Sequence, residues 1–470
     1  MHQRVRRPSF VIEGALGARA PRPRTQLCAR APRGIPTKNL LPRFALPTRC
    51  CNFAIQIMRP PPIMKFIHTA DWHLGNTFHG HSRTDEHQHF LQWLLQTLQE
   101  RQPDALLVTG DVFDTPNPSA EAENLFFDFL HHATEAVEGL QIVVVAGNHD
   151  SGGRLDAPDA LLKERGVYVR GLVRRTDSGA PNYDEHILPL STRTDPEARI
   201  VVFALPFLRS NDYAAGTSMQ EALRAYIDNM YKQLRKSPFK GLPVVVCAHF
   251  YAQGAEVNEV EHSERLVVGG QDLVEADVVS RGASYVALGH IHKAQQVDDV
   301  TWYAGSALPM SFAEKFYQHG VCEVEISDEG DASVSQIPYA PLRTLISIPG
   351  RGAALAGEVL DALATLPKRK KDDDGSDWPY LEIRVRETQP EPGLLRDVTA
   401  ALQDRAVRFC RMVREREVQP ADKVQARNLQ DLQSITPDDL LRRVFRSRYG
   451  EELPDEMATR FQQASEAAAE

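Results

Sequence analysis

Short apolar runs alternate with longer amphipathic stretches from residue 64 onward. The short runs predict buried parallel strands, and the stretches between them repeat apolar side chains at helical spacing. Two helices are expected at Thr84–Arg101 and Ser119–Ala136, the second with Ser119 as its N-cap. The predicted strands are Lys65–His68, Ala105–Thr109, Ile142–Ala146, Ile200–Ala204, Val244–Ala248 and Tyr285–Leu288. This alternation predicts an α/β sandwich flanked by helices.

The pattern changes after residue 300. Helical spacing stops between Thr301 and Tyr339, and strand-like runs there predict a second sheet with antiparallel pairing: Trp302–Ala304, Gly320–Ile326 and Ala332–Ile337. We expect the first domain, residues 64–340, to end near Pro338–Pro341.

A smaller α+β unit is expected at residues 341–418. Its predicted elements are strand Leu345–Ile348, helix Ala353–Leu366, strand Tyr380–Val385 and helix Gly393–Leu402. Two amphipathic helices, Pro437–Arg448 and Pro454–Ala468, are predicted in the last segment, residues 419–470. Short helices cannot bury their apolar stripes alone, so we expect these two to dock on their own protein or on a partner.

Charge is divided unevenly between residues 1–63 and the rest of the chain. The sequence has 54 Lys and Arg against 63 Asp and Glu, a net charge of −9. Residues 1–63 contain eleven Arg, one Lys and one acid, Glu13, so they carry +11 and leave −20 for the remainder. They also hold ten of the 31 prolines and lack periodicity, which predicts a disordered basic leader. An organelle transit peptide is one interpretation, but the abrupt start of order at Met64 favours a mis-assigned start codon.

Composition excludes several classes of protein. No run approaches the roughly 18 apolar residues of a membrane span. Cys247, Cys322 and Cys410 are far apart with no CxxC, which argues against a zinc ribbon or disulfide scaffold and favours a reducing compartment. A charge of −20 argues against binding polyanions by bulk charge, so affinity for nucleic acid must come from local patches, metals or a partner.

Polar side chains follow five of the predicted strands. In chain order they are Asp71 and His73, Asp111 and Asp114, Asn148 and His149, His249, and His290 and His292. Ligands bind outside the carboxyl ends of strands in an open α/β sheet, so we expect these side chains at one rim. Because residues i and i+2 of a strand face the same way, Asp71 and His73 are expected to face one metal. Glycines before Asp111, Asn148 and His290 would let the backbone turn sharply.

The ligand types indicate the metal. Carboxylate, amide and imidazole groups without thiolate suit Mn²⁺, Fe²⁺ or Mg²⁺. Leaving out Asp114 and His149, the set is larger than one ion needs, and one shared carboxylate with three further ligands on each side would hold two ions about 3.5–4 Å apart. Such a pair activates water near neutral pH and clamps the oxygens of a phosphoryl group. Each motif alone is weak, but the ordered set favours a metal site over purely structural roles.

This ordered set resembles the calcineurin-like metallophosphoesterase superfamily, and most closely its SbcD branch of nuclease subunits. The residues that carry the resemblance are 68–75 (HTADWHLG), 86–88 (EHQ), 110–114 (GDVFD), 146–151 (AGNHDS), 287–292 (ALGHIH), Gly305-Ser306 and Ser311-Phe312. The resemblance is strong from Met64 to about Tyr339 and rests on architecture alone beyond it. Residues 1–63 have no counterpart in it.

The resemblance implies a role for each residue of the set. Asp71, His73 and His292 would bind one metal, Asn148, His249 and His290 the other, and Asp111 would bridge the two. His149 would stand beside the phosphate as general acid or transition-state stabiliser. The carboxylate of Asp114 would hold the His149 ring in its catalytic tautomer.

The resemblance also implies a Mn²⁺-dependent DNA nuclease subunit that acts in DNA repair, recombination and replication. Its activities would be double-strand exonuclease and hairpin or single-strand endonuclease, with an SbcC-type coiled-coil ATPase as partner. No P-loop occurs in this sequence, so ATP would be handled by that partner. The implied assembly is a homodimer within a heterotetramer, cytoplasmic and nucleoid-associated. Residues 341–418 would cap the active site and help to choose DNA, and residues 419–470 would grip the coiled coil.

Two rival functions share these residues. A phosphoprotein phosphatase or cyclic-nucleotide phosphodiesterase would use the same ligands, although a small substrate needs neither the extra unit nor the tail helices. A non-catalytic scaffold for the ATPase would be expected to have lost some ligands.

Overall fold

The computed structural model describes residues 64–256, 273–389 and 391–416, with ten single residues between positions 441 and 461. The predicted leader, residues 1–63, lies outside this part, as do most residues of the two predicted tail helices. No helix within the described ranges has the length and apolar character of a bilayer span.

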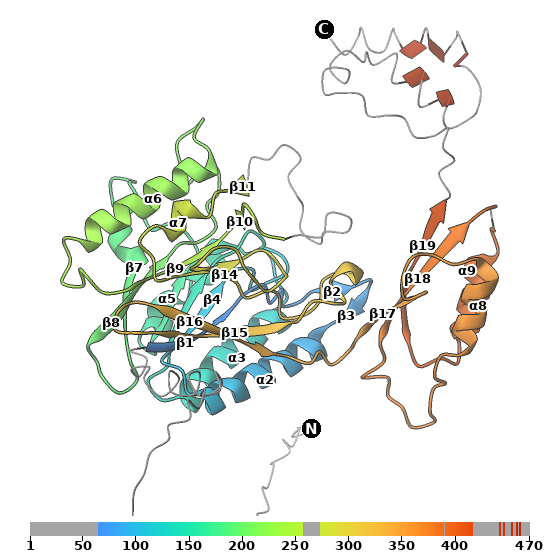
Figure 1. The fold of residues 1–470 in the computed structure, drawn as a ribbon, viewed down its shortest axis with the longest axis horizontal. Coiled ribbons are helices and arrows are strands. Elements are labelled where there is room, and N and C mark those ends of the chain that lie inside the picture. Colours follow the sequence, from blue (N-terminus) through green and yellow to red (C-terminus); the bar gives the residue numbers. More distant parts are fainter. Residues whose placement is uncertain are drawn as a thin grey trace, which may run out of the picture. The chain divides into compact units, whose positions relative to one another are not determined.

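Two six-stranded sheets stack face to face in the body of the protein (Figure 1). In spatial order, the first contains β16 (Ala332–Pro338), β15 (Gly320–Ile326), β1 (Met64–Thr69), β4 (Ala105–Thr109), β5 (Gln141–Val145) and β6 (Val167–Arg170). The second contains β13 (Gln295–Gln296), β14 (Thr301–Tyr303), β12 (Tyr285–Gly289), β9 (Val244–His249), β8 (Ala198–Ala204) and β7 (Ile187–Ser191). Their facing side chains, among them Phe66, Val145, Val202 and Tyr285, form one buried cluster. The predicted α/β sandwich is confirmed.

Helices cover the outer face of each sheet (Figure 1). Helices α2 (Thr84–Arg101) and α3 (Ala120–Ala136) pack Phe90, Leu94 and Phe126 against the first sheet. Helices α6 (Met219–Leu234) and α7 (Asp277–Ser280) cover the second. The expected N-cap is present, because the Ser119 side chain accepts a hydrogen bond from the backbone N–H of Ala122 at 3.2 Å. Shorter elements are α4 (Gly152–Asp156), α5 (Asp159–Lys163), η1 (Tyr183–His186), η2 (Phe312–Glu314), β2 (Thr77–Phe78), β3 (His81–Ser82), β10 (Tyr251–Ala252) and β11 (Leu273–Val274).

The expectation of a separate antiparallel sheet after residue 300 is wrong. The strands exist, but β14 pairs in parallel with β12 of the second sheet, while β15 pairs antiparallel with β1 of the first. The central strands of both sheets are buried on both faces, and each sheet needs further strands to cover its edge. Sequence periodicity marks a strand without specifying its neighbour, so it could not show this division.

A third, three-stranded sheet follows. It consists of β17 (Leu345–Ile348), β18 (Tyr380–Glu387) and β19 (Arg408–Arg416), all parallel, with α8 (Ala356–Ala364) and α9 (Leu394–Leu402) packed on it. The predicted strand at Leu345–Ile348 has the observed bounds, and the predicted helices begin one to three residues early. Strand β19 was missed, because its sequence RFCRMVRER is dominated by charge rather than by an apolar run.

Candidate metal centre

The rims of the two large sheets meet where the candidate residues lie. Asp71, Asp111 and Asn148 follow β1, β4 and β5 of the first sheet. His249 ends β9, and His290 and His292 follow β12, in the second sheet. The expected rim is therefore shared by two sheets rather than belonging to one.

Strained backbone brings these side chains together. Within the described ranges six residues other than glycine have positive φ, and four of them are Asp71 (52°), His73 (46°), Asp111 (48°) and His290 (101°). Such conformations cost roughly 1–3 kcal/mol each and persist where the surrounding structure holds them, commonly at functional sites. Strand β1 ends at Thr69, so Asp71 and His73 do not converge by the strand alternation that their i, i+2 spacing predicted. They converge through left-handed turns.

The preceding glycines act in two different ways. Gly110 has a φ of +91°, which L side chains rarely adopt, so it makes the expected sharp turn. Gly147 and Gly289 instead leave room for a close approach. A Cβ on Gly147 would lie 2.1 Å from Oδ1 of Asp111, and one on Gly289 would lie 2.0 Å from the carbonyl oxygen of Thr109.

Three overlapping groups of described side chains present ligand atoms within 4.8 Å of one another. They are Asp71 with His73 and His292, His73 with Asp111 and His149, and Asp111 with His249 and His290. Asn148 joins the last group, because its Oδ1 lies 2.9 Å from Nε2 of His249 and 3.0 Å from Nδ1 of His290. The structure thus brings every predicted ligand to one place, with Asp111 between the two predicted sets.

The electrostatics of the centre reflect its buried carboxylates. Asp71 and Asp111 are fully buried among imidazoles, and burial raises the pKa of Asp71 to about 6. Burial alone would lower the pKa of His249, but the Asp111 carboxylate, 3.2 Å from its Nε2, raises that pKa to about 9. Buried carboxylates without a cation are costly, so this oxygen and imidazole donor set fits divalent metal ions.

His149 is oriented by main-chain contacts. Its backbone N–H donates to Oδ1 of Asp111 at 2.8 Å, and its ring Nδ1 donates to the carbonyl oxygen of Asp114 at 2.8 Å. The prediction assigned this ring contact to the Asp114 carboxylate. The hydrogen bond comes from the backbone carbonyl, while the Asp114 carboxylate lies 3.5 Å from Nδ1 of His73 and accepts a bond from Asn76 at 2.9 Å. Because a carbonyl only accepts, Nε2 is the nitrogen of His149 that gains or loses a proton.

Two buried acids that support the centre were not singled out by sequence reasoning. The Asp150 carboxylate accepts hydrogen bonds from the backbone N–H groups of Val112, Phe113 and Gly147, at 3.2, 2.9 and 2.8 Å, and so joins the loops after β4 and β5. The Glu314 carboxylate lies 3.2 Å from Nδ1 of His292. Both acids lie within two residues of a pair that carried the family resemblance, Asn148-His149 or Ser311-Phe312, and that proximity is the signal that could have found them.

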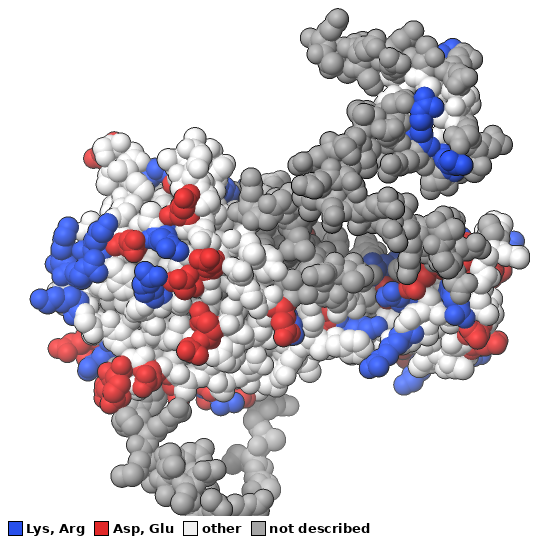
Figure 2. Space-filling model, turned by 45° about the horizontal axis from the view of Figure 1, so that its top comes forward, with Lys and Arg blue, Asp and Glu red and all other residues white. Residues whose placement is uncertain are grey.

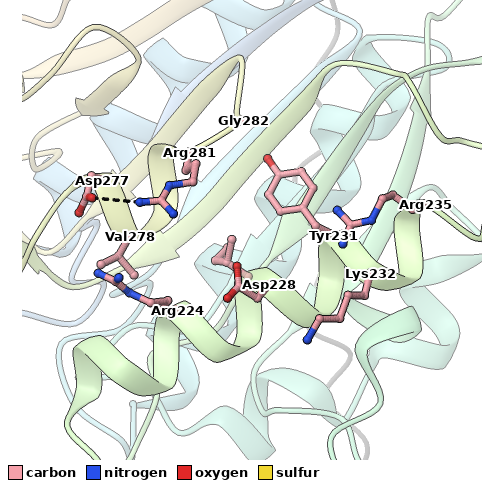
Figure 3. A pocket seen from close by; sticks show the side chains of 10 residues that line it. Arg224, Asp228, Tyr231, Lys232, Arg235, Asp277, Val278, Arg281 and Gly282 are labelled. Atoms are coloured by element: carbon pink, nitrogen blue, oxygen red, sulfur yellow. Dashed lines mark ion pairs between the residues drawn. The ribbon is translucent and has the colours of Figure 1, made fainter.

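A hollow of about 320 Å³ lies away from these residues, between α6 and α7 (Figure 3). It is lined by basic side chains of Arg224, Lys232 and Arg235 on α6, with Arg281 after α7 paired to Asp277 at 3.6 Å. On the face drawn in Figure 2, acidic and basic side chains are otherwise intermixed. The described part of this face therefore presents no continuous basic track for a polyanion.

The fold and the centre together define a metallophosphoesterase. Residues 64–294 match the family model described as calcineurin-like phosphoesterase, and residues 341–449 match one described as type 5 capsule protein repressor C-terminal domain. Three relatives each carry the name of the D chain of nuclease SbcCD. That of Rhodobacter capsulatus is 36% identical over 397 residues, which cover 81% of this chain and 94% of the relative.

The other two relatives match over shorter stretches. That of Escherichia coli K12 is 35% identical over 264 residues, covering 53% of this chain and 62% of the relative. That of Bacillus subtilis is 31% identical over 334 residues, covering 68% and 79%. The chain belongs to the SbcD family of nuclease subunits. It is accordingly a nuclease component that hydrolyses phosphodiester bonds.

Proposed function

We propose that this protein cleaves DNA with two divalent metal ions, with Mn²⁺ as the preferred ion and Mg²⁺ or Fe²⁺ as alternatives. One ion would be held by Asp71, His73 and His292. The other would be held by Asn148, His249 and His290. The observation that carries the proposal is the position of Asp111, whose carboxylate belongs to ligand groups on both sides. Two bound ions would supply an activated water and neutralise charge on the phosphate oxygens.

His149 is the proposed general acid or transition-state stabiliser. Its Nδ1 proton is committed to the carbonyl oxygen of Asp114, which fixes the ring and directs proton exchange to Nε2. Protonated Nε2 can donate to the leaving oxygen or to the developing charge on the phosphate. Asp114 takes part through its backbone at His149 and through its carboxylate at His73.

The assembly proposed is the one that the relatives' names describe, with an SbcC-type ATPase as the second component and DNA as substrate. We propose a homodimer within a heterotetramer that acts as double-strand exonuclease and as hairpin or single-strand endonuclease. The net charge of −9 supports a division of labour, because a chain this acidic gains little DNA affinity from bulk charge. Residues 341–418 would act as the capping unit, and residues 419–470 would dock the ATPase.

The test is cleavage of a hairpin DNA by the full chain mixed with its ATPase partner. Mn²⁺ should support cleavage and a chelator should stop it. His149→Gln should keep both Mn²⁺ ions yet lose cleavage at least ~100-fold, the usual contribution of a general acid. Cleavage that survives metal removal would refute the two-metal proposal. Loss of a Mn²⁺ ion in His149→Gln would instead make His149 a ligand.

A further inference from the structure

Glu314 is a buried carboxylate with a direct contact to a proposed metal ligand. It is 4% exposed, His292 is 5% exposed, and Oε1 of Glu314 lies 3.2 Å from Nδ1 of His292. A carboxylate accepts, so Nδ1 of His292 carries the proton and Nε2 carries the lone pair. His292 belongs to the ligand group with Asp71 and His73. The carboxylate therefore selects the tautomer that can bind a metal through Nε2.

The other oxygen of Glu314 is also engaged. Oε2 accepts from the backbone N–H of Met310 at 2.8 Å, and the hydroxyl of Ser311 donates to Oε1 at 3.3 Å. The carboxylate thus joins the imidazole on one side to residues 310–311 on the other, and both of its oxygens accept. An amide of the same shape cannot do this, because one of its two ends is a donor.

The segment that contains Glu314 is held in turn by a buried cluster of side chains. Arg83 donates to the carbonyl oxygen of Pro309 at 2.7 Å and makes two hydrogen bonds to Glu86, each 3.1 Å. The hydroxyl of Tyr380, on β18, donates to the same Glu86 carboxylate at 2.6 Å. Arg83, Glu86 and Tyr380 are all fully buried. The sheet β17–β19 is therefore connected to the segment that positions Glu314.

A second connection joins the same two parts. Nζ of Lys315 donates to Oγ of Ser347 on β17 at 2.8 Å, and Ser347 donates to Glu382 on β18 at 2.9 Å. Phe312 packs its ring 5.3 Å from that of Phe78, which lies 4.9 Å from the ring of Tyr380. Residues on both sides of Glu314 are thus tied to the third sheet.

We infer that Glu314 is a positioning residue for His292, and that the sheet β17–β19 holds Glu314 in place through Tyr380 and Ser347. The inference rests on the proposed two-metal function. It makes one of the two metal sites, that of Asp71, His73 and His292, dependent on the third sheet. Because the contact of Glu314 is with a ligand of that site, the two ions should respond differently to changes here.

The experiment measures Mn²⁺ binding to the full chain by calorimetry and by electron paramagnetic resonance. In Glu314→Gln one Mn²⁺ should bind ~10–100-fold more weakly, the usual effect of removing a group that orients a metal ligand. The second ion should keep its affinity, and the spin-coupled spectrum of the pair should give way to that of isolated Mn²⁺. Tyr380→Phe should weaken the same ion by a smaller factor. Glu329→Gln, at an exposed turn, is the matched control and should bind as wild type.

Each outcome decides between distinct conclusions. Unchanged binding in Glu314→Gln would overturn the positioning role while leaving the proposed function intact. An equal loss at both sites would mean that Glu314 only supports the fold. Tyr380→Phe with wild-type affinity would remove the third sheet from the inference. A wild-type chain that fails to bind two ions would refute the proposed function itself.

Discussion

Replacing Gly147 with alanine should disturb the metal centre far more than its small size suggests. The added Cβ would lie 2.1 Å from Oδ1 of Asp111 and 2.3 Å from the Asp111 backbone nitrogen. Ordinary contact begins near 3.4 Å, so the strand end must move by about 1 Å. Overpacking of this kind costs roughly 1–3 kcal/mol. A displacement of 1 Å in a catalytic constellation costs about 100-fold in activity.

Gly153→Ala is the matched control, because it lies six residues along the same loop and helix. Its Cβ would meet nothing closer than a Leu172 methyl group at 4.0 Å, and alanine favours the helix α4 in which it lies by up to about 1 kcal/mol. Calorimetry should show Mn²⁺ affinity falling at least about 10-fold in Gly147→Ala, with wild-type affinity in Gly153→Ala. Urea unfolding should show a loss of about 1–3 kcal/mol in the first variant only. If both variants bind Mn²⁺ as wild type does, the close packing of Gly147 against Asp111 does not control the centre.

Two further predictions concern stability. Tyr380→Phe removes a buried hydrogen bond to the Glu86 carboxylate and should lower the free energy of unfolding in urea by about 1.5–3 kcal/mol; a wild-type value would contradict the buried cluster. His186 donates from Nδ1 to the carbonyl oxygen of Ala204 and accepts at Nε2 from the Arg174 N–H, and burial lowers its pKa to about 4. Because the folded pKa is below the unfolded value of about 6.5, its contribution is complete above pH 6.5 and declines as pH falls toward 4, by up to about 3 kcal/mol. The stability of wild type relative to His186→Gln should therefore fall across that range in urea titrations, and a constant difference would refute the assignment.

Local patterns in the sequence were sufficient to predict most strands and helices. The bounds of α2 were predicted as observed, because its apolar face repeats at helical spacing. Strand partners were not predicted, since the pairing of β15 with β1 joins residues about 260 apart and leaves no local trace. Strand β19 was missed because Arg and Glu alternate with its apolar residues at a sheet whose faces are partly exposed.

The candidate site could be predicted for a different reason. Its members directly follow strands, so their positions are legible in the chain even though those five strands are divided between two sheets. What sequence could not supply was the means of convergence. Left-handed backbone at Asp71 and Asp111 replaces the expected strand alternation, and the carbonyl of Asp114 replaces its carboxylate at the His149 ring. Glu314 was missed because its contact with His292 depends on the turn η2 rather than on the end of a strand.

The central claim is that Asp111 is shared by two metal ions. It is tested most directly by the number of Mn²⁺ ions bound per chain, measured by calorimetry and electron paramagnetic resonance on wild type and Asp111→Asn. The wild-type chain should bind two ions with a spin-coupled spectrum, and Asp111→Asn should weaken both ions and abolish the coupling. A single ion in wild type, or an Asp111→Asn variant that loses only one of two, would contradict a shared carboxylate.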